Sequence, residues 1–407
     1  MDLDGDMKKK VIIIGGGPAG YNAAISCSRA GMETILFEQD RLGGTCVNRG
    51  CVPTKVYLEA VKAKQHLQTI GIKTDLDPAV LRRAAESKIT QLGFGAEYVL
   101  RKNSVEIRRT SASIAGEKLV KTAEGELLSC DALVLASGSA PVVPKGLDCA
   151  NLYTVPQLLE LSHLPKTLTI VGAGILGLEL AVILSAVGVK ITLLEREAEI
   201  LPGWDQDVRS SMHGYLKRIG IEIKLGAEET KCENAVYCTG HRPSLPEGTA
   251  SGIDLKKSDW IYIIGDAAGK YMVADTAMEE GSRIAEQILR GRKYAELKPA
   301  KCIFTPLQAA SVGEVCRSPL RESYFSVDDH AAGKISGIEG GFVKAVMEEG
   351  SHVLKGFHIV STQAAEIIQI GQVAIAEEMR AEEFIKLVFP HPTEGEILKE
   401  AVKLLCG

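Results

Sequence analysis

Short apolar runs, glycine-rich turns and helix-like segments alternate in the same order at two places in the chain. The first place has an apolar run over residues 11–14, a glycine turn, a helix-like run to Ala30 and a second apolar run over 34–37. The second place repeats this order, with apolar runs over 168–171 and 191–194. Short apolar runs that are bounded by turns and separated by helical segments predict two βαβ units with parallel strands.

The glycines of both units have the spacing of a dinucleotide-binding fingerprint. In such a loop the first glycine makes the tight turn, the second lets the backbone approach a pyrophosphate, and the third lets helix and strand pack closely. The helix that follows offers N–H groups to the phosphates. An acidic residue ends the next strand at the same distance in both units, from Gly15 to Glu38 and from Gly172 to Glu195. Since a carboxylate there can bind a ribose hydroxyl, we predict two dinucleotide sites.

Length, composition and charge restrict the class of protein. A chain of 407 residues suggests two to three domains, and 45% hydrophobic and 24% charged residues are typical of a soluble globular protein. The net charge of −5, without a dense basic stripe, argues against a nucleic-acid partner. The most apolar long stretch, 168–191, contains Glu179 and several glycines, so no membrane span is expected. Glycines end the apolar run after residue 14 too early for a signal peptide, so we expect a cytoplasmic protein.

Cys46 and Cys51 are the candidate redox pair. They precede a helix-like run, and Lys55 follows them closely. The positive end of a helix dipole and a nearby lysine both lower the pKa of a thiol and favour the thiolate. The alternatives are half of a metal site or two core cysteines, but zinc needs further ligands and the other eight cysteines have no paired metal spacing. We therefore predict a redox disulfide and no metal.

His391 and Glu396 are the candidate base and its partner. Only a thiolate attacks a disulfide, so thiol–disulfide exchange needs a proton acceptor. Histidine suits this role near neutral pH, and a carboxylate on its other ring nitrogen fixes the tautomer. Taken alone, this histidine could be an ordinary loop residue. The dithiol elsewhere in the chain favours the catalytic interpretation.

A family resemblance rests on the cysteine segment 43–55, the two fingerprints, the Gly-Asp turn at 265–266 and the segment 389–396. On these features the chain resembles the flavoprotein disulfide reductases of the class I pyridine nucleotide-disulfide oxidoreductase family. Within that family it is most similar to the branch that oxidises dihydrolipoamide. The resemblance covers nearly the whole chain. It implies an α/β protein with two Rossmann-like domains, one for FAD (1–150 and 238–299) and one for NAD (151–237), and an α+β dimerisation domain (300–407).

The resemblance also implies roles for single residues. Cys46 is expected to exchange with the substrate, Cys51 to face the flavin, and Lys55 to lie near the reactive edge of the flavin and pair with Glu179. The residues expected to bind FAD are Gly15, Gly17, Pro18, Ala19, Gly20, Glu38, Gly44, Thr45, Lys55, Ser137, Gly138 and Asp266. Those expected to bind NAD are Gly172, Gly174, Ile175, Gly177, Glu179, Glu195 and Gly240.

The implied partners are a second copy of the chain and a lipoyl-bearing protein. In this family the histidine acts on the dithiol of the other subunit, so an obligate homodimer is expected. The lipoyl group would belong to a 2-oxoacid dehydrogenase complex or to the glycine-cleavage system, and the sequence does not decide between them.

Three features favour NAD and dihydrolipoamide. Glu195 would repel the 2′-phosphate of NADP, although Arg196 follows it. Ile175 stands where glutathione-type reductases have a gating tyrosine. The C-terminal tail has a single cysteine, Cys406. Two alternatives remain. The protein could be an NADP-dependent reductase of another small disulfide, or a weakly active paralogue that serves as a subunit of a multienzyme complex.

The chain also departs from the family pattern. Between residues 225 and 235 there is room only for a brief connection where family members carry a β-meander, so a trimmed NAD-binding lobe is expected. Two further departures concern the fine tuning of the reaction and not its class. Residues 273–275 read Val-Ala-Asp in place of Leu-Ala-His, and residues 329–332 contain His330 where an arginine is common.

Overall fold

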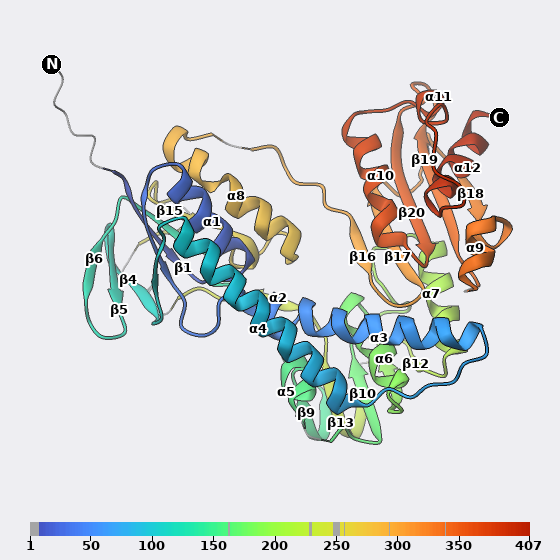
Figure 1. Cartoon of the computed structure of the whole chain (residues 1–407), viewed down its shortest axis with the longest axis horizontal. Coiled ribbons are helices and arrows are strands. Elements are labelled where there is room, and N and C mark those ends of the chain that lie inside the picture. Colours follow the sequence, from blue (N-terminus) through green and yellow to red (C-terminus); the bar gives the residue numbers. More distant parts are fainter. Residues whose placement is uncertain are drawn as a thin grey trace. The chain divides into compact units, whose positions relative to one another are not determined.

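The fold is given by a computed structural model that describes residues 8–161, 163–227, 230–246, 253–255, 257–292, 294–337 and 339–407. The chain divides into two compact units (Figure 1). Unit 1 comprises Met1–Pro53, Arg82–Val142 and Gly240–Leu297, and unit 2 comprises Thr54–Leu81, Val143–Thr239 and Lys298–Gly407. Residues 1–7 of the predicted FAD domain lie outside the described residues.

A parallel five-stranded sheet forms the centre of unit 1, in the order β15-β7-β1-β2-β3. The strands are β1 (Lys10–Ile14), β2 (Glu33–Phe37), β3 (Glu106–Arg108), β7 (Ala132–Leu135) and β15 (Ile261–Ile263). Val11 and Ile13 are buried with residues of α1 (Pro18–Arg29) and α8 (Ala274–Arg290), which lie side by side (Figure 1). Ile12 and Ile14 are buried instead with a small antiparallel sheet. Because both faces are covered, the central strands β1 and β7 are continuous apolar runs, not alternating ones.

Unit 1 also contains a small antiparallel sheet, a two-stranded ladder and the helices that follow β2. The small antiparallel sheet consists of β4 (Ala112–Gly116), β5 (Leu119–Thr122) and β6 (Leu127–Ser129). The short strands β8 (Ser139–Pro141) and β14 (His241–Pro243) pair antiparallel. The helices α2 (Gly44–Arg49), α3 (Cys51–Thr69) and α4 (Pro78–Lys102) follow β2 along the chain, and α3 runs on into unit 2.

Unit 2 contains the second nucleotide-type sheet, which is also parallel and has the order β12-β11-β10-β13-β9. Its strands are β9 (Leu147–Tyr153), β10 (Thr167–Val171), β11 (Lys190–Leu194), β12 (Glu222–Lys224) and β13 (Thr230–Tyr237). The helices α5 (Val155–Glu160), α6 (Ile175–Ala186) and α7 (Gln206–Arg218) connect them. Only residues 225–229 lie between β12 and β13, so the connection is as short as the sequence predicts.

A disulfide joins Cys149 on β9 to Cys232 on β13. The two residues lie directly opposite each other in the parallel ladder, with 4.8 Å between their Cα atoms. The sequence interpretation did not predict this bond. The cysteines are 83 positions apart, and no short motif marks them.

The C-terminal part of unit 2 is an antiparallel sheet in the order β16-β17-β20-β19-β18, covered by helices. Its elements are β16 (Lys301–Ile303), β17 (Gln308–Gly313), β18 (Leu320–Ser326), η2 (Val327–Asp329), α9 (Ala331–Ser336), β19 (Phe342–Glu348), β20 (Leu354–Ser361), α10 (Ala364–Ala376), α11 (Ala381–Phe384) and α12 (Gly395–Cys406). The sheets observed confirm the predicted fold class.

An ion cluster around a buried lysine links this antiparallel sheet to helix α7 of the same unit. Lys344 on β19 is 4% exposed, and its Nζ lies 3.0 Å from Asp205 and 2.6 Å from Asp207 at the start of α7. Glu322 on β18 lies 3.4 Å away. Although burial opposes the charge, these carboxylates hold the pKa of Lys344 above its usual range. The ammonium is therefore charged and neutralises part of the cluster.

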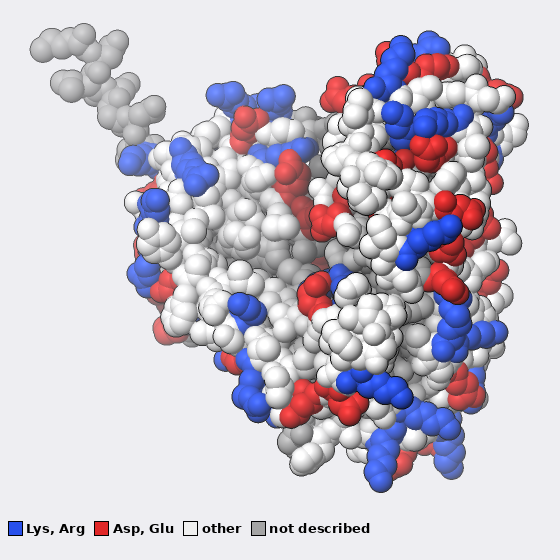
Figure 2. Space-filling view, turned by 45° about the vertical axis from the view of Figure 1, so that its right-hand side comes forward, with Lys and Arg blue, Asp and Glu red and all other residues white. Residues whose placement is uncertain are grey.

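The surface carries both signs of charge. Figure 2 shows lysines and arginines interspersed with aspartates and glutamates over the face in view, in keeping with the small net charge of −5. In the part of the chain that the structure describes, no helix combines the length and the apolar character that crossing a membrane would need.

Candidate functional site

The first fingerprint loop links β1 to α1 and leaves no room for side chains at two of its glycines. Gly15 has a φ of +106°, and a Cβ there would lie 2.3 Å from the carbonyl oxygen of Ala136. A Cβ at Gly20 would lie 1.7 Å from the carbonyl oxygen of Gly15. These two glycines are therefore required by the turn and by the close approach of helix and strand, as the fingerprint predicts.

A second glycine turn lies against this loop. Gly43 donates its N–H to the carbonyl oxygen of Gly16 over 2.8 Å, and a Cβ at Gly44 would lie 2.7 Å from Cα of Gly17. Pro18 starts α1, and its cap residue Gly17 provides no side-chain hydrogen bond to the first turn. The first N–H groups of a helix lack intrahelical partners and favour an anion. The loop thus fits the pyrophosphate of a dinucleotide.

The acidic residue at the end of each βαβ unit is held by the backbone of its own fingerprint loop. Glu38 is 9% exposed and accepts hydrogen bonds from the N–H groups of Gly16 and Asp40, both over 2.8 Å. Glu195 is 8% exposed and accepts equivalent bonds from Ala173 over 2.7 Å and from Glu197 over 3.1 Å. Both carboxylates are therefore fixed beside the loop that would hold the phosphates.

The second fingerprint loop repeats the geometry of the first between β10 and α6. Gly172 has a φ of +103°, and a Cβ there would lie 2.7 Å from the carbonyl oxygen of Cys238. A Cβ at Gly177 would lie 1.9 Å from the carbonyl oxygen of Gly172. Gly174 caps α6 without a side-chain bond, and Ile175 begins the helix. This loop also fits a pyrophosphate. Gly240, the last residue of the predicted NAD set, belongs to unit 1 and has a φ of +91°.

Asp266 lies in the short helix η1 (Gly265–Ala268), and its Oδ2 accepts a hydrogen bond from Ser139 Oγ over 2.7 Å. Ser137 and Gly138 form the turn just before Ser139, where Ser137 Oγ donates to the carbonyl oxygen of Ser244 over 2.6 Å. The structure thus brings these predicted FAD residues together within unit 1. Ser139 itself was not predicted, because its pairing with Asp266 joins residues that are far apart in the sequence.

A second residue that the sequence did not indicate is Glu280 on α8. Its carboxylate accepts the N–H of Gly265 over 2.6 Å. Burial raises the pKa of Glu280, while the bond from Gly265 opposes this rise. Glu280 therefore holds the start of the turn that carries Asp266.

The two redox cysteines lie on either side of a helix break. Cys46 is in the short helix α2, Gly50 ends that helix, and Cys51 is the first residue of α3. Both side chains are half-buried. The helix predicted after the cysteines is confirmed as α3, but Cys51 is already its first residue, and Cys46 lies in a separate helix because Gly50 adopts a non-helical backbone between them. Asn48 braces the segment by donating to the carbonyl oxygens of Leu42 and Gly44 over 3.1 and 2.9 Å.

Lys55 and Glu179 form the predicted pair inside unit 2. Lys55 Nζ lies 2.8 Å from Oε2 of Glu179, whose side chain is 2% exposed. The other oxygen of Glu179 accepts the N–H of Phe304 over 3.0 Å. In this structure Glu179 therefore links α3, α6 and the segment that follows β16.

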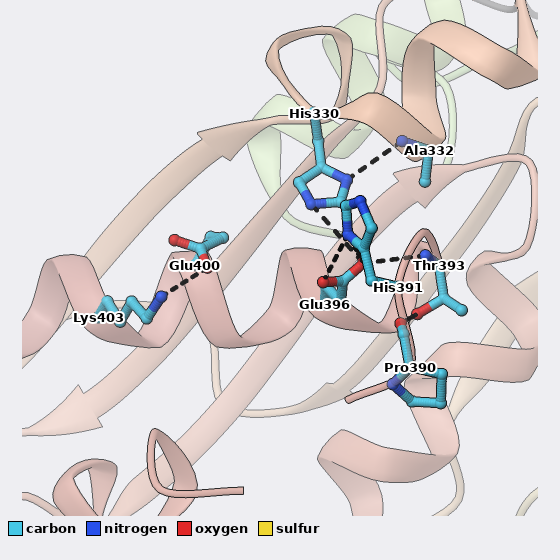
Figure 3. A network of polar contacts seen from close by, with 8 residues as sticks. All are labelled: His330, Ala332, Pro390, His391, Thr393, Glu396, Glu400 and Lys403. Atoms are coloured by element: carbon cyan, nitrogen blue, oxygen red, sulfur yellow. Dashed lines mark hydrogen bonds and ion pairs between the residues drawn. The ribbon is translucent and has the colours of Figure 1, made fainter. Parts of the chain in front are cut away.

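His391 and Glu396 also form the predicted pair (Figure 3). Nδ1 of His391 lies 3.1 Å from both carboxylate oxygens, and the N–H of Thr393 donates to Oε2 over 3.0 Å. The Thr393 N–H, followed by His391, holds the pKa of Glu396 below its usual range. The carboxylate places the ring proton on Nδ1, which leaves Nε2 to accept a proton. The His391 side chain is 68% exposed, so a substrate can approach it.

Among the described residues there is no group of three or more histidine, cysteine, aspartate or glutamate side chains arranged to hold a metal ion. Of the other cysteines, Cys27 is buried and Cys238 is half-buried, and desolvation by apolar neighbours raises the pKa of each thiol to about 12. Burial likewise raises the pKa of Cys130 to about 11. Thiols of this kind are packing residues and poor nucleophiles.

Two family models match most of the chain. Residues 9–237 match a model described as pyridine nucleotide-disulphide oxidoreductase, and residues 299–402 match its dimerisation domain. Members of this family typically bind FAD and a pyridine nucleotide.

Named relatives and solved structures agree with these matches over nearly the whole chain. A dihydrolipoyl dehydrogenase of Pseudomonas aeruginosa is 29% identical over 463 residues, which cover 98% of each chain. A dihydrolipoyl dehydrogenase of Bacillus subtilis is 28% identical, with 97% of this chain and 98% of that one covered. The crystal structure of LpdA from Mycobacterium tuberculosis matches with a TM-score of 0.86 at 21% identity, with 98% and 99% covered. The HOCl-induced flavoprotein disulfide reductase RclA from Escherichia coli matches with a TM-score of 0.86 at 20% identity, with 97% and 100% covered.

Proposed function

Because the chain belongs to the pyridine nucleotide-disulphide oxidoreductase family, we propose that it is an FAD-dependent dihydrolipoamide dehydrogenase that oxidises protein-bound dihydrolipoamide and reduces NAD. The observation that carries the proposal is the His391–Glu396 pair, an accessible imidazole whose Nδ1 is held by a carboxylate. Thiol oxidation needs such a base, whereas a protein that only binds other subunits does not. Relatives called dihydrolipoyl dehydrogenases support the choice of substrate.

The proposed domains follow from the two glycine loops. Residues 1–150 and 238–299 would bind FAD through the loop after β1, Glu38, the 43–45 turn, the 137–138 turn, Lys55 and Asp266. Residues 151–237 would bind NAD through the loop after β10, and residues 300–407 would form the dimerisation domain. FAD, when bound, would carry the electron pair between the dithiol and the nicotinamide.

The proposed exchange begins when Nε2 of His391 accepts a proton from one thiol of dihydrolipoamide. The resulting thiolate attacks the sulfur of Cys46 in the Cys46–Cys51 disulfide, and Cys51 leaves as a thiolate. The second substrate thiol then attacks the substrate sulfur of this mixed disulfide, and its proton passes to the departing sulfur of Cys46. Oxidised lipoamide leaves, and both cysteines are reduced. Glu396 stabilises the imidazolium of His391 throughout these steps.

The choice of NAD rests on Glu195. A buried carboxylate that is fixed beside the second glycine loop can bind a ribose 2′-hydroxyl but repels a 2′-phosphate. Arg196, which follows Glu195, lies 3.2 Å from Glu197 and is thus engaged by a neighbouring carboxylate. This arrangement supports NAD over NADP.

We propose a homodimer as the active form, in which His391 of one copy serves the Cys46–Cys51 pair of the other. The match to the family's dimerisation domain and the exposure of His391 in the single chain support this arrangement. The physiological partner would be a lipoyl-bearing protein of a 2-oxoacid dehydrogenase complex or of the glycine-cleavage system.

The decisive experiment measures NADH formation from NAD and dihydrolipoamide by the FAD-loaded protein, with NADP as the parallel acceptor. The matched variant is His391→Gln, and NADH-dependent reduction of ferricyanide serves as the control because it needs no thiol base. We expect activity with NAD alone, a loss of about 100-fold in H391Q, and an unchanged control reaction. Activity confined to NADP would indicate a reductase of another small disulfide. A flavin-loaded protein that is inactive with both nucleotides would favour a subunit without turnover.

A further inference from the structure

His330 is a second histidine beside the His391–Glu396 pair. It precedes α9 and caps that helix, because its Nδ1 accepts the N–H of Ala332 over 3.3 Å. A ring nitrogen that accepts a hydrogen bond carries no proton, so the ring proton of His330 lies on Nε2. The helix cap therefore sets the tautomer of this histidine.

The same ring points its Nε2 at the carboxylate of Glu396. The distance from Nε2 to Oε2 is 4.0 Å, and the ring stands edge-on to His391 with 6.4 Å between the centroids (Figure 3). The His330 side chain is 15% exposed, against 68% for His391. His330 is thus the inner of the two imidazoles, and Glu396 faces both of them.

We propose that His330 is a positioning residue for the proton acceptor: by directing Nε2–H toward Glu396 from 4.0 Å, it acts electrostatically on the carboxylate that His391 and Thr393 hydrogen-bond. The inference rests on the proposed function, since it concerns the same base. It assigns a role to a position where the chain departs from the pattern of the family it resembles.

The charge balance around Glu396 predicts the direction of the effect. Within the described part of the chain, the groups that face this carboxylate are His391, His330 and the N–H of Thr393. One turn further along α12, Glu400 and Lys403 pair with each other over 2.7 Å. An N–H dipole, or a full positive charge on a protonated ring, offsets part of the negative potential that Glu396 exerts on His391. Loss of His330 should therefore favour the imidazolium of His391.

The variant that separates this role from helix capping is His330→Asn. Asparagine is a preferred N-cap residue, so it can still accept the N–H of Ala332, but it has no second ring nitrogen to reach Glu396. His330→Ala removes both functions and serves as the matched comparison. Neither variant alters His391 or Glu396.

The experiment records kcat/KM for dihydrolipoamide against pH, together with NADH-dependent ferricyanide reduction and thermal unfolding. For H330N we expect wild-type unfolding and ferricyanide reduction, and an acid limb that moves up by about half a pH unit, which is about threefold lower kcat/KM on that limb. H330A should show the same shift and also unfold at a lower temperature.

An H330N profile that superimposes on the wild-type profile would overturn the inference. So would a loss of ferricyanide reduction in H330N, since that would indicate a general structural defect. Failure of the proposed function has a different signature: H391Q would then oxidise dihydrolipoamide as fast as the wild type, whatever H330N does.

Discussion

Nζ of Lys55 lies 2.8 Å from Oε2 of Glu179, and the same Nζ lies 4.6 Å from the centroid of the Phe304 ring. Glu179 is almost fully buried and bonds the N–H of Phe304 with its other oxygen. One buried carboxylate thus holds a lysine of α3 and the backbone that follows β16. The pair that the family resemblance assigns to the flavin also connects three segments of unit 2.

Lys55→Met should destabilise the protein more than Glu179→Gln. K55M leaves a buried carboxylate without its counter-charge, which costs about 3 kcal/mol. In E179Q the amide oxygen can still accept the N–H of Phe304, and the partly exposed Lys55 can turn to water, so we expect about 1 kcal/mol. Urea unfolding of both variants and of the double variant measures the difference. If the double variant proved as unstable as K55M, the buried charge would not be the cause.

Reduction of the Cys149–Cys232 bond should weaken unit 2. The bond closes a loop of 83 positions that contains β10, α6 and β11. The chain-entropy model assigns about 4.5 kcal/mol to a loop of this length. Thermal unfolding of the wild type should therefore shift down in dithiothreitol.

The double variant C149S/C232S provides the control for this shift. It should already unfold at the lower temperature and respond little further to dithiothreitol, whereas Cys406→Ser, which changes an exposed thiol, should behave as the wild type. A wild type that resists reduction without losing stability would contradict the prediction. Mass spectrometry of unreduced peptides checks the pairing directly.

Features encoded over short distances could be predicted from the sequence. The glycine loops, Glu38 and Glu195 lie within single βαβ units, where spacing fixes geometry, and the His391–Glu396 pair spans five positions across a loop and a first helical turn. The two half-buried cysteines were recognised for the same reason. The helix break at Gly50 could not be predicted, because a glycine alone does not indicate whether a helix ends there or continues through it.

Features that depend on long-range register could not be predicted. Cys149 meets Cys232 only because β9 and β13 are neighbours in one particular parallel register. Ser139 meets Asp266 through a turn of unit 1, and His330 meets Glu396 because the starts of α9 and α12 come together in the C-terminal part of unit 2. No local pattern of residues indicates such contacts, since each depends on the pairing of whole strands or helices.

Glu195→Gln should relax the preference for NAD. A glutamine can still accept the N–H of Ala173 through its amide oxygen, so the loop should keep its shape, but it no longer repels a 2′-phosphate. We expect the ratio of kcat/KM for NAD to that for NADP to fall about tenfold. Steady-state kinetics with both nucleotides measures the ratio. The matched variant Glu38→Gln changes the equivalent carboxylate of the other loop and should affect retention of FAD without altering the ratio.

His358 should make stability depend on pH below the neutral range. This residue lies on β20 and is 1% exposed. Ser311 Oγ–H donates to its Nδ1 over 2.9 Å, and its Nε2–H donates to the carbonyl oxygen of Glu314 over 3.1 Å. These bonds satisfy the neutral ring, and burial lowers the pKa of His358, assisted by the charge of Lys344 and opposed by Asp205. Between the folded pKa and the unfolded value of about 6.5, only the unfolded chain binds the proton.

Stability should therefore fall as the pH drops below about 6.5, with a slope of at most about 1.4 kcal/mol per pH unit from this group. His358→Gln keeps a donor and an acceptor but cannot titrate, so its unfolding free energy should lose this component of the slope. Urea unfolding of wild type and variant between pH 7.5 and 5 measures the difference between the two curves, and His66→Gln, which removes an exposed imidazole, is the matched control. Parallel curves of unfolding free energy against pH for the wild type and H358Q would contradict the prediction. They would mean that the buried ring takes up a proton in the folded protein as readily as in the unfolded chain, and that Ser311 and Glu314 do not hold it neutral.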